Sequence, residues 1–205
     1  MAETGIKIDI FRKKTLEDFT AILSDPESRL ECGSAAASVA AIAAALLARA
    51  AKLLHAEHEN DGNTEQLAWY VKNTEILRGY MVNLIDEDVK CRGPLRRALK
   101  EGSEDRIEAS RQASVSICLE IINMMGKCLE LSAGLLPFSG SGAFPYVTEC
   151  AELAYSASLA AGNYVLSMSR LSTDDTYRYV MKRENELTMQ QEKDYLDRLR
   201  SAVNK

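Results

Sequence analysis

The stretch that decides the fold is residues 33–55, which read GSAAASVAAIAAALLARAAKLLH. Alanine and leucine dominate it, and both have high helix propensity. Gly33 and Ser34 stand where such a helix would begin. Small side chains let helix axes approach closely, so this segment is predicted to be a tightly packed central helix.

Outward from this stretch, the rest of the chain also follows helical signals. Thr15, three residues before Asp18, predicts a capped helix start, and glycine and proline separate the later segments. No segment shows the strict alternation of a strand. The sequence therefore predicts an all-α bundle of long helices around the alanine-rich one. The other expected helices cover residues 15–25, 64–90, 103–134, 147–170 and 174–203.

Composition narrows the class of protein. The 205 residues are 46% hydrophobic and 27% charged with no shift midway, which predicts one domain over residues 1–205. No charge-free apolar run reaches the length of a membrane span and no export signal is recognised, so we expect a soluble, cytoplasmic protein without a membrane partner. The net charge of −5 argues against nucleic-acid binding.

The sequence predicts no metal site. The five cysteines are an odd number without a Cys-x-x-Cys pair, which favours neither a disulfide framework nor zinc. His55 and His58 lie three residues apart without a convincing third ligand. We expect the cysteines to be mostly small buried side chains and the histidines to be polar residues near a helix end.

Two segments point to function or assembly. Residues 154–162 carry small side chains on nearly every face, which fits a helix surrounded by protein, including a second subunit in a homodimer.

Asp86, Glu87 and Asp88 are consecutive, so on a helix they point about 100° apart and only one or two can face a cavity. Asp86 is the better candidate and Asp88 could also point inward. The alternative is a solvated acidic face.

The order of these features resembles that of the cyclodeaminase/cyclohydrolase family, helical folate enzymes that include the C-terminal part of formiminotransferase-cyclodeaminase. The resemblance spans nearly the whole chain. It departs from the family at residues 30–32, which read Leu-Glu-Cys instead of Pro-Gly-Gly, at Ala143 instead of Asn, and at Thr148-Glu149 instead of Ser-Asp. The matching segments are 15–24, 33–37, 84–88, 142–151 and 163–171.

The resemblance implies a homodimer that acts on a tetrahydrofolate derivative without a covalently bound cofactor. The family adds water to 5,10-methenyltetrahydrofolate, or forms that cation from the formimino compound by expelling ammonia. Acid–base catalysis and stabilisation of the cation need carboxylates. By this resemblance, Asp86, Asp88 and Glu149 are the catalytic candidates. The residues expected to bind substrate are Gly33, Ser34, Lys52, Arg92 and Gly142, with Lys52 or Arg92 at the glutamate tail.

Simpler interpretations remain open for most of these positions. Ser34 could be an ordinary helix N-cap, Glu149 a surface acid, and the basic residues solubilising surface. Glu31, beside the helix start, would oppose an anionic ligand. For the whole chain, the main alternative to an enzyme is a divergent family member without turnover, acting as a folate-binding or assembly subunit. A helical interaction domain unrelated to folate is the third hypothesis.

Overall fold

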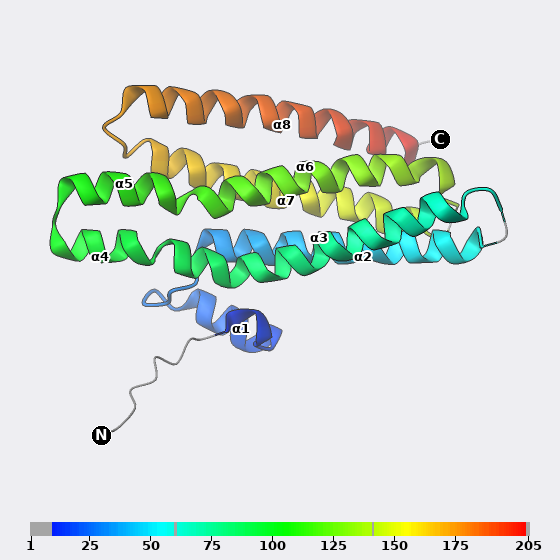
Figure 1. Cartoon of the computed structure of the whole chain (residues 1–205), viewed down its shortest axis with the longest axis horizontal. Coiled ribbons are helices and arrows are strands. Elements are labelled where there is room, and N and C mark those ends of the chain that lie inside the picture. The colour runs from blue at the N-terminus through cyan, green and yellow to red at the C-terminus, as the bar shows by residue number, and fades with distance from the viewer. Residues whose placement is uncertain (1–9, 60, 141, 204–205) are drawn as a thin grey trace, which may run out of the picture.

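The computed structural model describes residues 10–59, 61–140 and 142–203, and these contain helices and no strand. The prediction of an all-α bundle is confirmed, and Figure 1 shows the long helices lying side by side. Residues 1–9, which belong to the region searched for an export signal, lie outside the described part. The elements are η1 (Phe11–Lys13), α1 (Leu16–Ser24), α2 (Cys32–Glu57), α3 (Thr64–Cys91), α4 (Gly93–Glu101), α5 (Glu104–Ser114), α6 (Ser116–Leu135), η2 (Leu136–Phe138), α7 (Phe144–Ser169) and α8 (Asp175–Val203).

The alanine-rich helix α2 packs mainly against α3 and α7, and also against α6. Its alanine methyl groups fill little space, so the neighbouring helices can pack closely while the apolar surface is still removed from water. The core-facing side of α2 is therefore built almost entirely from small residues with a few leucines. Its buried residues are Gly33, Ser34, Ala36, Ala37, Ala40, Ala43, Ala44, Leu47, Ala48, Ala50, Ala51 and Leu54.

By length and composition, α2 is also apolar enough to cross a membrane, which differs from the expectation drawn from charge-free runs. It has 26 residues, and its most apolar window has a mean hydropathy of 1.7 with half of that window buried inside the protein. A core helix of a soluble bundle passes the same test. Within the described residues, the neighbours of α2 are the helices of this bundle.

Local signals placed some helix ends correctly and missed others. Thr15 accepts a hydrogen bond from the Asp18 backbone N–H at 3.1 Å, which confirms the predicted cap of α1. Helix α3 ends at Cys91, just before Gly93-Pro94 as predicted, and the same pair begins α4, because proline in a first turn loses no helical hydrogen bond. The single helix expected over 103–134 is two helices, α5 and α6, separated at Val115, where no glycine or proline marks the break.

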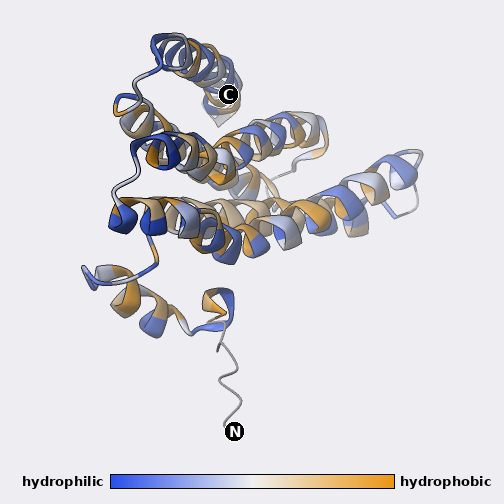
Figure 2. Ribbon diagram, turned by 60° about the vertical axis from the view of Figure 1, so that its left-hand side comes forward, coloured by the Kyte–Doolittle hydropathy of each residue, from blue (hydrophilic) through white to orange (hydrophobic). Residues whose placement is uncertain are grey.

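Helix α8 is mostly hydrophilic in Figure 2, and it docks on the small-residue face of α7 with two buried leucines, Leu196 and Leu199, and the buried Glu192. A methyl group on Gly162 would lie 2.3 Å from Asn185 Oδ1, so only glycine leaves room for that amide. Ser158 donates a hydrogen bond to Glu192 Oε1 at 2.8 Å. Burial raises the pKa of Glu192 to about 7, and the bond from Ser158 offsets only part of this rise.

We predict that Glu192 makes the free energy of unfolding fall between about pH 4.5 and 7. Unfolded, this carboxyl loses its proton near its usual pKa of 4.5, whereas the folded protein keeps the proton up to about pH 7. The folded state binds more protons in that window, so stability decreases as pH rises, by on the order of 3 kcal/mol, and levels off above it.

Glu192→Gln should flatten this pH dependence. Urea denaturation of the wild type and the variant at several pH values measures it, and the difference between the two proteins isolates the contribution of Glu192. Identical slopes for the two proteins would contradict the prediction.

Candidate functional site

The structure brings together the two motifs that the sequence singled out, the start of α2 and the acidic end of α3. Ser34 donates its hydroxyl to Asp88 Oδ2 at 2.9 Å, and both side chains are fully buried. A Cβ on Gly33 would lie 2.1 Å from Asp88 Oδ1, so the absence of a side chain there gives the carboxylate its place. Ser34 is not the N-cap of α2, since that position is Glu31.

Arg92, at the junction of α3 and α4, is the centre of this cluster and only 1% exposed. Its Nε donates to Asp88 Oδ1 at 2.9 Å, and its Nη1 donates to Glu31 Oε2. On its other side, the guanidinium carbon lies 4.0 Å from the centre of the Tyr164 ring of α7. Carboxylates and an aromatic face together replace the water that this buried charge has lost.

Burial controls the proton equilibria of the cluster. It raises the pKa of Asp88, and the opposing effects of Arg92 and Ser34 are smaller. For Arg92, burial disfavours the charged form, but the Asp88 carboxylate and other neighbours outweigh it and raise the pKa, so the guanidinium stays charged. Burial also raises the pKa of Cys118 and that of Tyr164, each to about 12. The thiol and phenol are therefore neutral at physiological pH.

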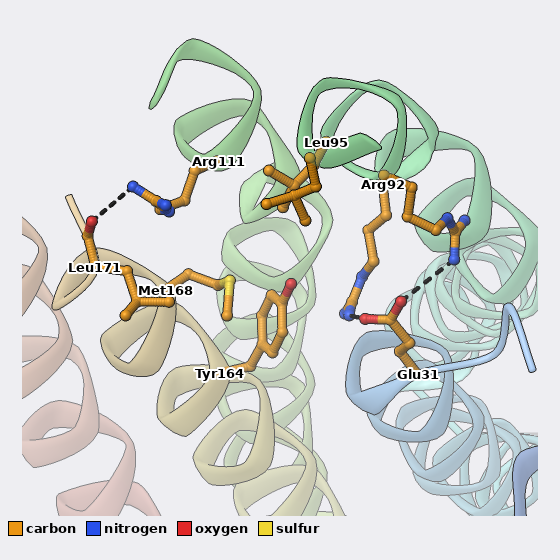
Figure 3. A pocket seen from close by; sticks show the side chains of 9 residues that line it. Glu31, Arg92, Leu95, Arg111, Tyr164, Met168 and Leu171 are labelled. Atoms are coloured by element: carbon orange, nitrogen blue, oxygen red, sulfur yellow. Dashed lines mark hydrogen bonds and ion pairs between the residues drawn. The ribbon is translucent and has the colours of Figure 1, made fainter. Parts of the chain in front are cut away.

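A cleft of about 240 Å³ opens beside Arg92, between α4, α5 and the end of α7. Figure 3 shows Tyr164 and Met168 on one side of it, Leu95 on another, and Glu31 joined to Arg92. Arg111 at its far rim donates to the Leu171 carbonyl at 2.6 Å. The lining residues are Glu31, Arg92, Leu95, Arg96, Leu99, Arg111, Tyr164, Met168 and Leu171.

The cleft is lined by apolar, negatively charged and positively charged side chains. Its apolar side chains and the Tyr164 ring suit a flat aromatic group. The Glu31 side chain is 38% exposed, so its carboxylate is accessible to a ligand with a positive charge. Arg96 donates to Glu31 Oε1 at 3.2 Å, and Arg111 pairs with Glu108 Oε2 at 2.8 Å, so both guanidinium groups at the rim already have a carboxylate partner. Their other N–H groups can donate to an anionic group of a ligand. No cluster of three or more potential metal ligands occurs among the described residues.

Asp86, the preferred catalytic candidate of the sequence, has different partners from Asp88. It is 4% exposed and accepts hydrogen bonds from the backbone N–H of Phe11 at 2.7 Å and from Arg12 Nη1 at 2.6 Å. Two residues apart on a helix, Asp86 and Asp88 point to different sides of α3. Asp86 fastens η1 to α3 and does not line the cleft. Of the triplet, Glu87 alone is solvated, pairing with Lys90 at 2.7 Å.

The remaining predicted residues lie away from this cluster in the chain. Lys52 pairs with Glu75 of α3 at 2.5 Å on the surface. Gly142 lies beside Glu57, since a Cβ there would be 3.3 Å from Glu57 Oε1, and Glu149 is exposed near the start of α7. Gly33 and Glu57 are about 36 Å apart along α2. One copy of the chain therefore unites Gly33, Ser34, Asp88 and Arg92, but not Lys52, Gly142 or Glu149.

The sequence does not predict that Glu31 and Tyr164 are partners of Arg92. The sequence around Glu31 indicates only repulsion of an anionic ligand, whereas the structure pairs Glu31 with Arg92 and Arg96. Tyr164 carries no local signal, because it meets Arg92 only after α7 has packed antiparallel to α2. A tyrosine on one helix and an arginine on another can be matched only once that packing is known.

The chain resembles known proteins in both sequence and fold. Residues 15–186 match the formiminotransferase-cyclodeaminase family. Among solved structures, it resembles the formiminotetrahydrofolate cyclodeaminase of Thermotoga maritima with a TM-score of 0.86 and 18% sequence identity, over 94% of this chain and 96% of that one. At that identity the structural likeness concerns the fold alone. No curated protein matches the sequence.

We predict that Gly33→Ala destabilises the protein by about 1–3 kcal/mol, because the new methyl group has to displace the buried Asp88 carboxylate. Gly79→Ala in the middle of α3 is the matched control, since a Cβ there meets nothing within 4 Å. That change should be neutral or stabilise the helix by up to about 1 kcal/mol. Urea titrations of both variants measure the difference, and equal stabilities would mean that Asp88 is not held against Gly33.

Proposed function

The chain belongs to the formiminotransferase-cyclodeaminase family, whose members work in folate one-carbon metabolism, and on that premise we propose that it is an enzyme acting on a tetrahydrofolate derivative. The substrate is 5,10-methenyltetrahydrofolate, which it hydrolyses, or the formimino compound, from which it releases ammonia. The observation that carries the proposal is the cluster of Gly33, Ser34, Asp88 and Arg92, which reaches an apolar cleft through Glu31. The family's place in folate metabolism also supports a cytoplasmic location.

Both reactions pass through a tetrahedral carbon between two nitrogens, and both involve a cationic amidinium. They need a carboxylate to stabilise the cation and groups to move a proton to or from water or ammonia. Glu31 is the carboxylate that lines the cleft, so we assign it the contact with the cation. Asp88, fully buried behind it, acts through Arg92 as a positioning residue.

The walls of the cleft support the placement of the folate. The flat ring system would lie against Tyr164 and the leucines, with the apolar surface removed from water. The glutamate tail carries carboxylates, which the guanidinium groups of Arg96 and Arg111 at the rim can bind. Arg92 itself, 2% exposed at its side chain, holds Glu31 in position from behind.

We further propose that the protein is a homodimer whose site is shared between subunits. The cleft volume of about 240 Å³ lies below the range of about 300–1,000 Å³ typical of small-molecule sites, so a second surface is needed to enclose a folate. Gly142 and Glu149, implicated by the same family resemblance, lie at the opposite end of the same chain. An antiparallel pair of subunits would bring the Gly142 end of one copy to the Arg92 end of the other.

A binding or assembly role without turnover is the second candidate, and one observation favours it. Asp86 and Asp88 are both fully engaged with partners of their own chain and neither lines the cleft. Residues 30–32 also lack the family's glycines. A protein of this kind would bind the folate but would not make its absorbance change faster than in buffer.

The predicted activity can be followed through the near-ultraviolet absorbance of the methenyl cation. Hydrolysis makes the absorbance of added 5,10-methenyltetrahydrofolate disappear faster than in buffer, whereas deamination of the formimino compound makes the same absorbance appear. Glu31→Gln and Asp88→Asn should each lower kcat/KM by roughly 100-fold or more, which is the scale of losing a positioned charge in an active site.

Glu87→Gln is the control in the same acidic triplet, because Glu87 is solvated and paired with Lys90, and it should retain full activity. Circular dichroism verifies that each variant is folded. Equal activity in Glu31→Gln and the wild type would refute the role of Glu31. Tight binding without any acceleration over the rate in buffer would establish the second candidate instead.

The shared site predicts complementation between inactive variants. Asp88→Asn and Glu149→Gln should each be inactive alone, because each damages one half of every site. Refolded together, half of the dimers contain both chains, and each of these has one intact site, so the mixture should recover about a quarter of the wild-type activity. Sedimentation should show twice the monomer mass of 22.7 kDa. Full activity of Glu149→Gln alone would confine the site to one chain.

A further inference from the structure

A second cleft, remote from the folate site, lies where α6 meets α8 and has a volume of about 340 Å³. Figure 1 shows α8 running along α6 and α7, at the side of the bundle away from α1. The cleft is lined mainly by polar side chains together with Ile122 and the backbone of Gly126. Its other lining residues are Asn123, Lys127, Glu130, Thr188, Gln191, Glu192 and Tyr195.

Glu192 is the unusual member of this lining. Its side chain is 2% exposed, and Ser158 donates to Oε1 at 2.8 Å. The other carboxylate oxygen, Oε2, is buried and has no hydrogen-bond partner among the described residues. A Cβ on Gly126 would be 3.4 Å from Oε1, which is an ordinary contact, so the carboxylate lies against α6. Its Oε2 is a buried acceptor that no group of the described chain satisfies.

Where Glu192 is ionised, the missing partner of Oε2 is a hydrogen-bond donor, and a positively charged donor compensates the carboxylate best. The cation nearest in the lining, Lys127, is already paired with Glu130 at 2.7 Å on the surface. The described lining contains no group of three or more His, Cys, Asp or Glu side chains. The amide and hydroxyl oxygens of Asn123, Gln191 and Thr188 are acceptors for further N–H groups.

We propose that the cleft between α6 and α8 binds a primary ammonium group, with Oε2 of Glu192 as its counter-ion. One N–H of the ammonium donates to Oε2, and the others donate to oxygen atoms of the lining. The Tyr195 ring and Ile122 offer apolar surface to the carbon that carries the nitrogen. This site uses none of the residues of the folate cleft and does not depend on the proposed enzymatic function.

The pKa of Glu192 reports directly whether a cation is bound in this cleft. Burial holds the pKa of Glu192 at about 7 in the unliganded protein. The other titratable groups of the cleft are Lys127, Glu130 and Tyr195, and Cys128 of α6 is also close to the carboxylate. A cation favours the ionised form of Glu192, so its binding has to lower that pKa and has to strengthen as pH rises through 7.

Carbon-13 NMR of labelled glutamate carboxyl groups, titrated with pH, tests the proposal with methylammonium chloride as the probe. Methylammonium has few atoms, so its dissociation constant should be on the order of 10 mM. About 100 mM of it should then lower the apparent pKa of Glu192 by about one pH unit. Tetramethylammonium chloride at equal concentration has no N–H group and should leave this pKa unchanged.

Three variants separate recognition from a general salt effect. Glu192→Gln should abolish the methylammonium-induced shifts of backbone amides around the cleft, and Asn123→Leu, which blocks the cleft but keeps Glu192, should do the same. Glu130→Gln changes an exposed carboxylate of the rim and should retain binding. The proposal is overturned if both cations shift the pKa of Glu192 equally, if neither does, or if Asn123→Leu binds methylammonium normally.

Discussion

The structure depends on one buried charge. The Arg92 guanidinium lies between the Asp88 carboxylate, the Glu31 carboxylate and the Tyr164 ring, so it ties together α3, the start of α2 and the end of α7. An arginine that is 1% exposed is tolerated only with such partners, because an uncompensated buried charge costs several kcal/mol. The requirement extends to Gly33, which has to lack a side chain for Asp88 to fit.

The alanine-rich packing and the ion cluster around Arg92 have different effects on the fold: the packing brings the helices close together, and the ion cluster aligns their ends. Small side chains along α2 bring α3 and α7 close, and that proximity lets side chains from three helices converge at one end of the bundle. Apolar packing has no direction, whereas the ion pairs and hydrogen bonds fix which ends of the helices meet. The cleft beside Arg92 is therefore bordered by fixed groups on its α2 side and by the leucines of α4 on the other.

Another ionisable side chain, Glu192 of α8, is also buried, but it has fewer hydrogen-bond partners than the carboxylates near Arg92. Asp86 and Asp88 have a partner on each carboxylate oxygen, while Glu192 has a single hydrogen bond from Ser158 and a second oxygen without one. Arg92 likewise has one nitrogen, Nη2, without a hydrogen-bond partner, but its charge is paired with Asp88 and Glu31. That difference separates ion pairs that stabilise the fold from a carboxylate whose pKa is raised by burial. Helix α8 thus combines a solvated outer face with one incompletely compensated acid at its contact with α6 and α7.

By itself, the sequence determined the helical class, the start of α1 at Thr15 and the positions of Gly33, Ser34, Asp88 and Arg92, because helix propensity, capping and family motifs are local patterns. The split between α5 and α6 at Val115 has no glycine or proline signal and was visible only in the tertiary structure. Tertiary structure alone also decided that Asp86 holds η1, that Tyr164 covers Arg92 and that Gly142 lies far from Gly33. Those relations depend on how separate helices are rotated and aligned against one another, which no local pattern in the chain encodes.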